Sequence, residues 1–383
     1  MSRRETRCDR SFTLLCVGLL LSAPLTRDRA LAQETTAGIR VPGPGIVPQL
    51  EFACCEHGLD EMRGLFAKPG VLSLIKNLHA TVAIPTSDFS SQRADVVRSL
   101  NQQGIPVVAW ILLDTDQGPY LTIDNVSQAV ARVGAFERWT SDYGLRWVAV
   151  GLDIEPDFAE LAQLHNHRWR LIATLFQRSL NLRRIANARK AYSALVEHIR
   201  SLGYPVQIYQ MPYIPAERSV HSSLPDRLLG TVDLDGDVDY LMLYTSFARP
   251  IGAGMIWSLG PHAQAIAIGN TDGGGTPGTA NGPLDWNEFS RDLIVASHFT
   301  RQIGVYDLEG CVRQNFLSHL LTLDWSQSVI VSERSVRQAR RFGFVTRSVL
   351  WVASNLVYLI VAGLLLSGWL LWRLRRLIWY RRR

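Results

Sequence analysis

Residues 147–157 read WVAVGLDIEPD, an apolar segment that ends in three acidic side chains. Five of its first six residues are apolar, which is typical of a strand that is buried on both faces. Because side chains alternate along a strand, Asp153 and Glu155 project from the same face. Pro156 favours an extended conformation at Glu155 and ends the strand, so Asp157 begins the following loop. The segment therefore predicts a buried strand that brings two carboxylates to one side of a sheet.

Seven further apolar, β-branched runs recur along the chain, and stretches with helical periodicity lie between them. Strands that alternate with helices indicate a parallel sheet covered by helices. Eight such units favour a closed (β/α)8 TIM barrel, and no glycine-rich dinucleotide or phosphate signature follows the early strands. An open doubly wound sheet is the alternative. The eight predicted strands are residues 50–56, 79–85, 106–114, 147–155, 206–213, 239–247, 265–270 and 302–307.

The two ends of the chain predict export and membrane anchoring. Four arginines precede an apolar run at residues 12–25, and Ala30, Leu31 and Ala32 provide a signal peptidase site, so residues 1–32 are predicted to be a signal peptide. Residues 349–372 carry no charge, and at about 1.5 Å per residue they are long enough to cross a hydrocarbon core of about 30 Å. The predicted segments are a barrel at 33–325, a juxtamembrane stalk at 326–347, a transmembrane helix at 348–372 and a basic cytoplasmic tail at 373–383.

A cleaved signal peptide leaves the barrel outside the cytoplasm, so the predicted location is the cytoplasmic (inner) membrane with the catalytic domain on the extracytoplasmic or periplasmic side. The net charge of +6 comes from the ends of the chain, because residues 33–333 hold 23 basic against 31 acidic side chains. This charge argues against nucleic acid as a partner, since phosphate contacts need clustered basic residues. The arginines that flank the predicted transmembrane helix are expected to meet anionic lipid headgroups.

Three cysteines follow the predicted signal peptide. An odd number in an oxidising compartment suggests one disulfide and one free thiol. Because the first and last strands of a closed barrel are neighbours, we expect Cys311 to pair with Cys54 or Cys55; three buried thiols are the alternative. No Cys or His spacing resembles a zinc site, so the sequence predicts neither a metal nor another cofactor.

Polar and acidic side chains recur where the predicted strands end. In a TIM barrel, catalytic groups come from the carboxyl ends of the strands. Asp153 and Glu155 would lie about 6 to 7 Å apart along their strand, and such crowding raises the pKa of at least one carboxyl, as a general acid requires. Capping of a helix, or pairing with Arg168 or Arg170, is the alternative role for these acids. The other strand ends carry Glu56, Asp114, Gln210, Tyr244, Asp272, Asp307 and Glu309.

Three of the predicted strands resemble those of glycoside hydrolases. The segment GLDIE at 151–155 resembles the fourth-strand signature of the chitinase-like family 18 and, equally, the Asp-x-Glu of the family 25 lysozymes. The segments VDYLMLYTSF at 238–247 and IGVYDLEG at 303–310 are similar to the sixth and eighth strands of family 18. The chain departs from that family at VVAWILLD, residues 107–114, and in its Asp-x-Glu-x-Asp spacing.

The resemblance implies that Glu155 is the catalytic acid, that Asp153 orients it and that Tyr244 holds an acetamido group of the substrate. The chitinase spacing would instead move the acid to Asp157.

We therefore interpret the chain as a membrane-anchored glycoside hydrolase that acts on an envelope or exopolysaccharide glycan, either a polysaccharide or an amino-sugar glycan. A glycosidase also needs a group that stabilises an oxocarbenium-like transition state. Asp114, Asp307, Glu309 or the substrate's own acetamide are the alternatives for that group. A non-catalytic glycan-binding scaffold and a metal-dependent phosphodiesterase or deacetylase are the competing functions. The predicted substrate-binding residues are Trp110, Asp114, Asp157, Gln210, Tyr213, Asp307 and Glu309.

Overall fold

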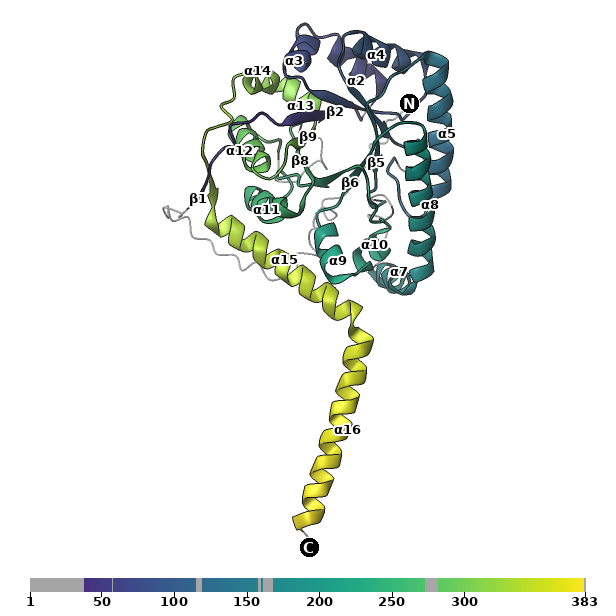
Figure 1. The fold of residues 1–383 in the computed structure, drawn as a ribbon, viewed down its shortest axis with the longest axis vertical. Helices are drawn as coiled ribbons and strands as arrows, with labels where there is room; N and C mark the ends of the chain where they lie inside the picture. Colours follow the sequence, from purple (N-terminus) through teal and green to yellow (C-terminus); the bar gives the residue numbers. More distant parts are fainter. Residues whose placement is uncertain are drawn as a thin grey trace.

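The computed structural model describes residues 38–56, 58–114, 119–157, 160, 168–272 and 282–381, so the predicted signal peptide lies outside the described residues. Eight parallel strands form a closed barrel in chain order (Figure 1), which confirms the predicted TIM barrel. The first and last of these strands pair directly. The strands are β2 (Gln49–Ala53), β3 (Thr81–Pro85), β4 (Val107–Ile111), β5 (Ala149–Asp153), β6 (Val206–Gln210), β7 (Val238–Met242), β8 (Ala265–Gly269) and β9 (Gln302–Tyr306).

Helices cover the outside of the barrel. Between β5 and β6 the helical segment is divided into two helices at Asn181, whose side chain accepts a hydrogen bond from the Arg184 backbone N–H and caps the second helix. The helices of the barrel domain are α2 (Leu59–Phe66), α3 (Val71–Asn77), α4 (Ser91–Gln102), α5 (Val126–Tyr143), α7 (Arg168–Leu180), α8 (Leu182–Ser201), α9 (Ile214–Val220), α10 (Leu224–Leu229), α11 (Gly252–Leu259), α12 (Trp286–Ser297), α13 (Leu308–Arg313) and α14 (Phe316–Leu320), with a 3-10 turn η2 (Gly260–His262). Among them, α7 lies at the end of the domain and contacts α10.

The strands divide their side chains between two cores. Outward-facing aliphatic residues pack beneath the helices, whereas inward-facing residues such as Trp110, Tyr240 and Met242 fill the barrel. Gly151 faces inward, and a Cβ atom there would lie 2.9 Å from the Tyr209 ring. The absence of a side chain at Gly151 therefore makes room for Tyr209 across the barrel. Asp153 follows two residues later on the same inner face.

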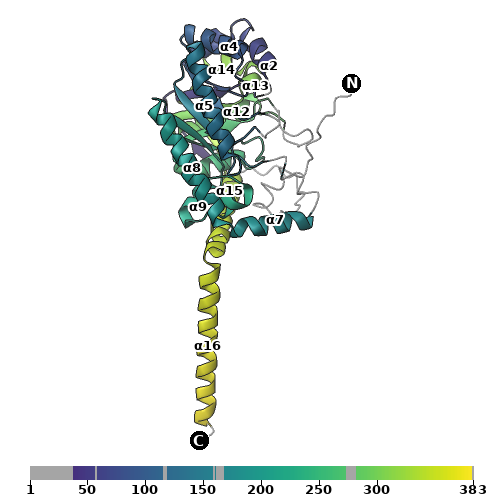
Figure 2. The same ribbon diagram turned by 90° about the vertical axis from the view of Figure 1, so that its right-hand side faces the viewer.

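The C-terminal part of the chain first packs on the barrel and then leaves it. Strand β10 (Val329–Ser332) pairs with β1 (Gly38–Val41) outside the barrel, and α15 (Glu333–Ser354) contacts α9 and α11. The segment predicted to be a juxtamembrane stalk, residues 326–347, thus contains β10 and about two-thirds of α15. Helix α16 (Leu356–Arg381) extends away from the barrel (Figures 1 and 2), and its segment Tyr358–Arg375 is long and apolar enough to span a membrane.

The packing of α15 on the barrel predicts which truncated chains stay stable. A chain that ends at Arg347 should remain folded, whereas one that ends at Glu333 should unfold more easily, because it loses Val336, which is 2% exposed. Burial of one valine side chain stabilises a fold by about 1.5 to 3 kcal/mol. Urea unfolding of the two truncated chains measures the difference. Equal free energies of unfolding would show that α15 does not stabilise the barrel.

Candidate active site

Three carboxyl groups gather at the carboxyl ends of β2 and β5. Asp153 ends β5, Glu155 follows two residues later and Glu56 lies just beyond β2. Burial raises the pKa of Glu155 well above its usual value, and the charges of Asp153 and Glu56 raise it further. Burial also raises the pKa of Asp153, with a further contribution from Glu56. Glu155 therefore keeps its proton at pH values where an exposed glutamate has lost it.

Glu56 is held in place by two phenol groups. The Tyr120 hydroxyl donates to Oε1 of Glu56 at 2.6 Å, and the Tyr306 hydroxyl donates to Oε2 at 2.6 Å. Both oxygens are acceptors, which is the pattern of a carboxylate. Tyr306 ends β9, whereas Tyr120 lies in the connection between β4 and α5. Tyr120 and Tyr306, from two distant parts of the chain, thus hold the Glu56 carboxylate near Asp153 and Glu155.

Within the described residues, one of the two carboxyl oxygens of Asp153 accepts a hydrogen bond. The Trp110 Nε1–H donates to Oδ2 of Asp153 at 3.2 Å. The other oxygen, Oδ1, is buried and has no hydrogen-bond partner among the described residues. A buried acceptor without a partner costs free energy, so Oδ1 is available to a donor group of a bound molecule.

Tyrosine rings form one wall of the site. The Tyr244 and Tyr306 rings lie 5.4 Å apart between centroids. Burial raises the pKa of the Tyr244 phenol, and the nearby charges of Asp153 and Glu155 raise it further. Tyr244 therefore stays a hydrogen-bond donor over the whole physiological pH range. Four predicted site residues, Trp110, Asp153, Glu155 and Tyr244, are brought together here.

Two predicted substrate-binding residues have their described hydrogen bonds away from the three carboxyl groups. Gln210 points to the outside of the barrel, because its neighbour Tyr209 points inward, and its Nε2 donates to the Leu234 carbonyl at 3.1 Å. The Tyr213 hydroxyl lies 2.6 Å from Thr231 Oγ1 in a buried contact. The described hydrogen bonds of both side chains therefore lie in the outer layer of the fold, and substrate binding by Gln210 and Tyr213 stays a prediction.

Two predicted acidic residues are exposed. Asp114 forms an ion pair with Arg132 at 3.1 Å. Asp157 accepts a hydrogen bond from the Glu160 backbone N–H at 2.8 Å. These contacts give both side chains roles in the loops, and neither side chain is joined to the three carboxyl groups by a hydrogen bond in the described part of the chain.

Asp307 and Glu309 are buried and bind the backbone. Asp307 caps α13, because its side chain accepts a hydrogen bond from the Gly310 N–H at 2.8 Å. Helix capping is the alternative role that the sequence suggests for Asp153 and Glu155. Glu309 Oε1 accepts from the Cys55 N–H at 2.5 Å. Burial, followed by the charge of Asp307, raises the pKa of Glu309 to about 8. Glu309 thus ties α13 to the end of β2, next to Glu56.

The disulfide in the structure differs from the predicted one. Cys54 is joined to Cys55, and Cys311 is a buried free thiol whose Sγ lies 3.7 Å from Thr271 Oγ1. Although β2 and β9 are neighbours as predicted, Cys311 lies beyond β9 in α13, and its side chain turns toward Thr271. A bridge between adjacent residues closes almost no loop and adds little stability by restricting the unfolded chain.

Peptide mapping of the exported protein without reduction is expected to find the peptide that holds Cys54 and Cys55 lighter by two hydrogens. Cys311 should react with an alkylating reagent only after unfolding, because it is buried. A peptide that joins Cys311 to either of the other two cysteines would contradict this pairing.

One group of side chains has the composition of a metal site. The sulfurs of Cys54 and Cys55 and a carboxylate oxygen of Glu309 lie within 4.8 Å of one another. Metal binding requires thiolates, and the disulfide removes both of them. This group is therefore assigned to the disulfide and to the hydrogen bond between Glu309 and Cys55.

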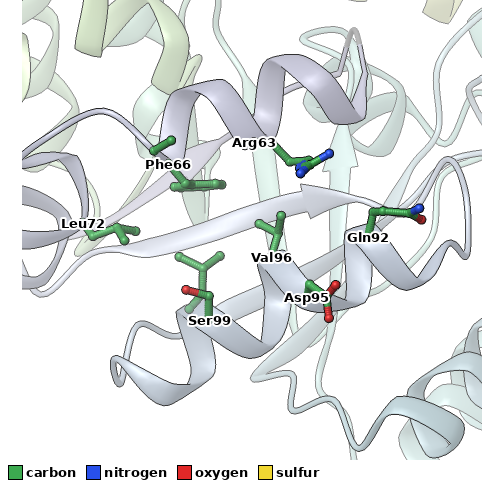
Figure 3. A pocket seen from close by; sticks show the side chains of 9 residues that line it. Arg63, Phe66, Leu72, Gln92, Asp95, Val96 and Ser99 are labelled. Carbon is green, nitrogen blue, oxygen red and sulfur yellow. The ribbon is translucent and has the colours of Figure 1, made fainter.

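A separate hollow of about 290 Å³ lies between α2 and α4 (Figure 3). Arg63 and Phe66 of α2 face Val96 and Ser99 of α4 across it. These helices cover the outside of the barrel, whereas the three carboxyl groups lie at its inner face. The hollow is therefore distinct from the candidate active site.

Comparison with solved structures finds similarities in fold, of which two are described. No family model and no curated protein sequence matches this chain. The glycoside hydrolase domain of PgaB (BpsB) from Bordetella bronchiseptica aligns with 73% of this chain and 99% of its own length, at 10% identity and a TM-score of 0.45. The xylanase-α-amylase inhibitor protein XAIP-I, solved with trehalose, covers the same shares at 10% identity and a TM-score of 0.39. At these scores no activity or residue role is transferred, so the functional argument rests on the site itself.

Proposed function

We propose that the chain is a membrane-anchored glycoside hydrolase with Glu155 as its general acid. The main support is the raised pKa of Glu155, which lies beside Asp153 and Glu56 at the inner face of the barrel. A glycosidase needs a proton donor for the leaving oxygen and a second group for the positive charge that develops on the sugar. Glu155 serves as the proton donor. The positive charge on the sugar is stabilised by the carboxylate of Glu56, or by the substrate's acetamide held by Asp153.

The surroundings of Asp153 favour an N-acetylated amino sugar as the substrate unit. The partnerless Oδ1 of Asp153 suits the amide N–H of an acetamido group. The Tyr244 phenol, which keeps its proton, suits the carbonyl oxygen of the same group. In this arrangement the acetamide oxygen attacks the anomeric carbon while Glu155 protonates the leaving oxygen. The ring of Tyr306, which is partly exposed, supplies apolar surface for a sugar face.

The location proposed for this activity is the extracytoplasmic side of the inner membrane, on an envelope glycan or exopolysaccharide. The export signal predicted at residues 1–32 and the apolar segment of α16 support it. The arginines near both ends of α16 suit anionic headgroups.

Release of reducing ends from matched N-acetylated and de-N-acetylated glycans tests the proposal. We expect release from the N-acetylated member of a pair, because only that glycan carries the acetamide. Release from both members at equal rates would remove the acetamide role and leave Glu56 as the second group. Saturable binding without any release would favour the non-catalytic scaffold, which the departure from the chitinase spacing supports.

A further inference from the structure

Helix α7 presents an apolar face that the described part of the chain leaves uncovered. Trp169, Ile172, Phe176 and Leu180 recur at helical spacing and are 84%, 56%, 67% and 67% exposed. At 3.6 residues per turn these side chains lie on one side of the helix. Large apolar side chains gathered on one exposed face mark an interaction surface.

The opposite face of α7 is attached to the barrel domain. Arg178 forms an ion pair with Glu160 at 2.6 Å and donates to the Leu228 carbonyl at 3.4 Å. Arg227 donates to the Ser179 carbonyl. Leu228 and Arg227 belong to α10, which also contacts α15. The apolar face therefore points away from the barrel domain, and α7 is connected through α10 to the helix that leads into α16.

Helix α7 lies crosswise to α16, at the end of the barrel domain from which α16 leaves. Figure 1 shows α7 nearly end-on at this end, and Figure 2 shows it from the side, near the last turns of α15. These turns also expose large apolar side chains, among them Phe344 and Val349. If α16 crosses a bilayer, α7 and the last turns of α15 lie on the same side of that bilayer, next to its surface.

We propose that α7 lies in the surface of the membrane that α16 crosses, with its apolar face among the lipid chains. The inference rests on the membrane-spanning assignment of α16, and it is independent of glycan hydrolysis. An amphipathic helix of this kind buries its apolar face about 5 to 10 Å into the boundary between headgroups and acyl chains. Arg170 of α7 is exposed, lies about 100° around the helix from Trp169 and matches the charge of anionic headgroups.

Membrane contact of α7 would also position the candidate active site. Helix α7 belongs to the connection that follows β5, the strand that ends in Asp153. A second contact with the bilayer, besides α16, would restrain rotation of the barrel about the anchor. The site would then be held at a constant height above the lipid.

Nitroxide labels in the full-length protein test this contact. The labels are attached at Ile172→Cys on α7, at Leu364→Cys in α16 and at Val130→Cys on α5, an exposed site on another side of the barrel. The protein is placed in nanodiscs with anionic lipid, and the unsubstituted chain serves as the labelling blank. Collisions with oxygen and with a water-soluble nickel chelate give the depth of each label. We expect Ile172→Cys at about 5 to 10 Å below the headgroups, Leu364→Cys deeper and Val130→Cys in water.

Each other result overturns the proposal for a distinct reason. If the label at Ile172→Cys is accessible to the nickel chelate while the label at Leu364→Cys is accessible only to oxygen, α16 spans the membrane and α7 remains in water. If Leu364→Cys also reads as water, the anchor assignment fails and the proposal fails with it, whatever the glycan assay shows. If the label on α7 is protected in detergent and shows spin–spin broadening that grows with protein concentration, the apolar face is covered by a second copy of the chain.

Discussion

Replacement of Glu155 by glutamine is expected to lower turnover of a glycan with a poor leaving group by about 10² to 10⁴-fold. Glutamine keeps the shape of the side chain but has no acidic proton to give to the leaving oxygen. The measurement is kcat from reducing-end release by the purified full-length variant. Asp153→Asn should also impair turnover, because it changes the acceptor that positions Glu155 or the acetamide.

Asp157→Asn is the matched control for Glu155→Gln. Asp157 is exposed and lies two residues further along the same segment, so this variant should keep most of its activity. Full activity of Glu155→Gln would remove Glu155 as the acid. Loss of activity in Asp157→Asn alone would move the acid to Asp157, the position that the chitinase spacing favours.

The stability of Glu155→Gln gives an independent check on the raised pKa. Because the folded-state pKa of Glu155 is raised above its unfolded value of about 4.5, its contribution to stability is present below that pH and is lost as the pH rises through the folded pKa. The variant should therefore lose less stability than the parent between pH 5 and pH 8. The measurement is the midpoint of thermal unfolding at several pH values from 5 to 8. If the midpoints of the two proteins change equally with pH, the pKa of Glu155 is not raised.

Replacement of Glu56 by glutamine is expected to reduce kcat by about 10² to 10³-fold, the usual loss when one preorganised group for transition-state charge is removed. It should also shift the alkaline limb of the pH profile of kcat/KM to lower pH. The charge of Glu56 helps to raise the pKa of Glu155, so its removal lets Glu155 lose its proton at lower pH. The profile of kcat/KM reports this pKa in the free enzyme.

Tyr120→Phe is a graded control for Glu56→Gln, because it removes one of the two phenol donors and leaves the Glu56 charge in place. We expect a smaller loss of kcat and no shift of the limb to lower pH. A Glu56→Gln variant with reduced kcat and an unmoved alkaline limb would give Glu56 a structural role only.

Local sequence patterns are sufficient to predict where the strands lie and which side chains of β5 share the inner face of the barrel. Continuous apolar runs identify strands that are buried on both faces, and each of the eight predicted strands overlaps an observed one. Alternation along a single strand placed Asp153 and Glu155 together without any knowledge of neighbouring strands. The composition of α16 likewise predicts a membrane span from local residues alone.

The assignments that depended on distant residues required the tertiary structure. The position of Gln210 at the end of a strand predicts that it lies in the site, but the direction of its side chain depends on strand register, and a shift of one residue moves a side chain to the other face. Cys311 was assigned to a bridge because two strands adjoin, but the direction of its side chain is set by α13. Glu56 was predicted only as one of several acids at strand ends, and Tyr120, in a loop, carried no signal.

The contacts that make Glu56 the centre of the site join it to Tyr120 and Tyr306, which are 64 and 250 residues away in the chain. Periodicity within a segment determines which side chains share a face, because it depends only on backbone geometry. Which faces meet depends on barrel closure and on register between strands, and these are set by packing across the whole core.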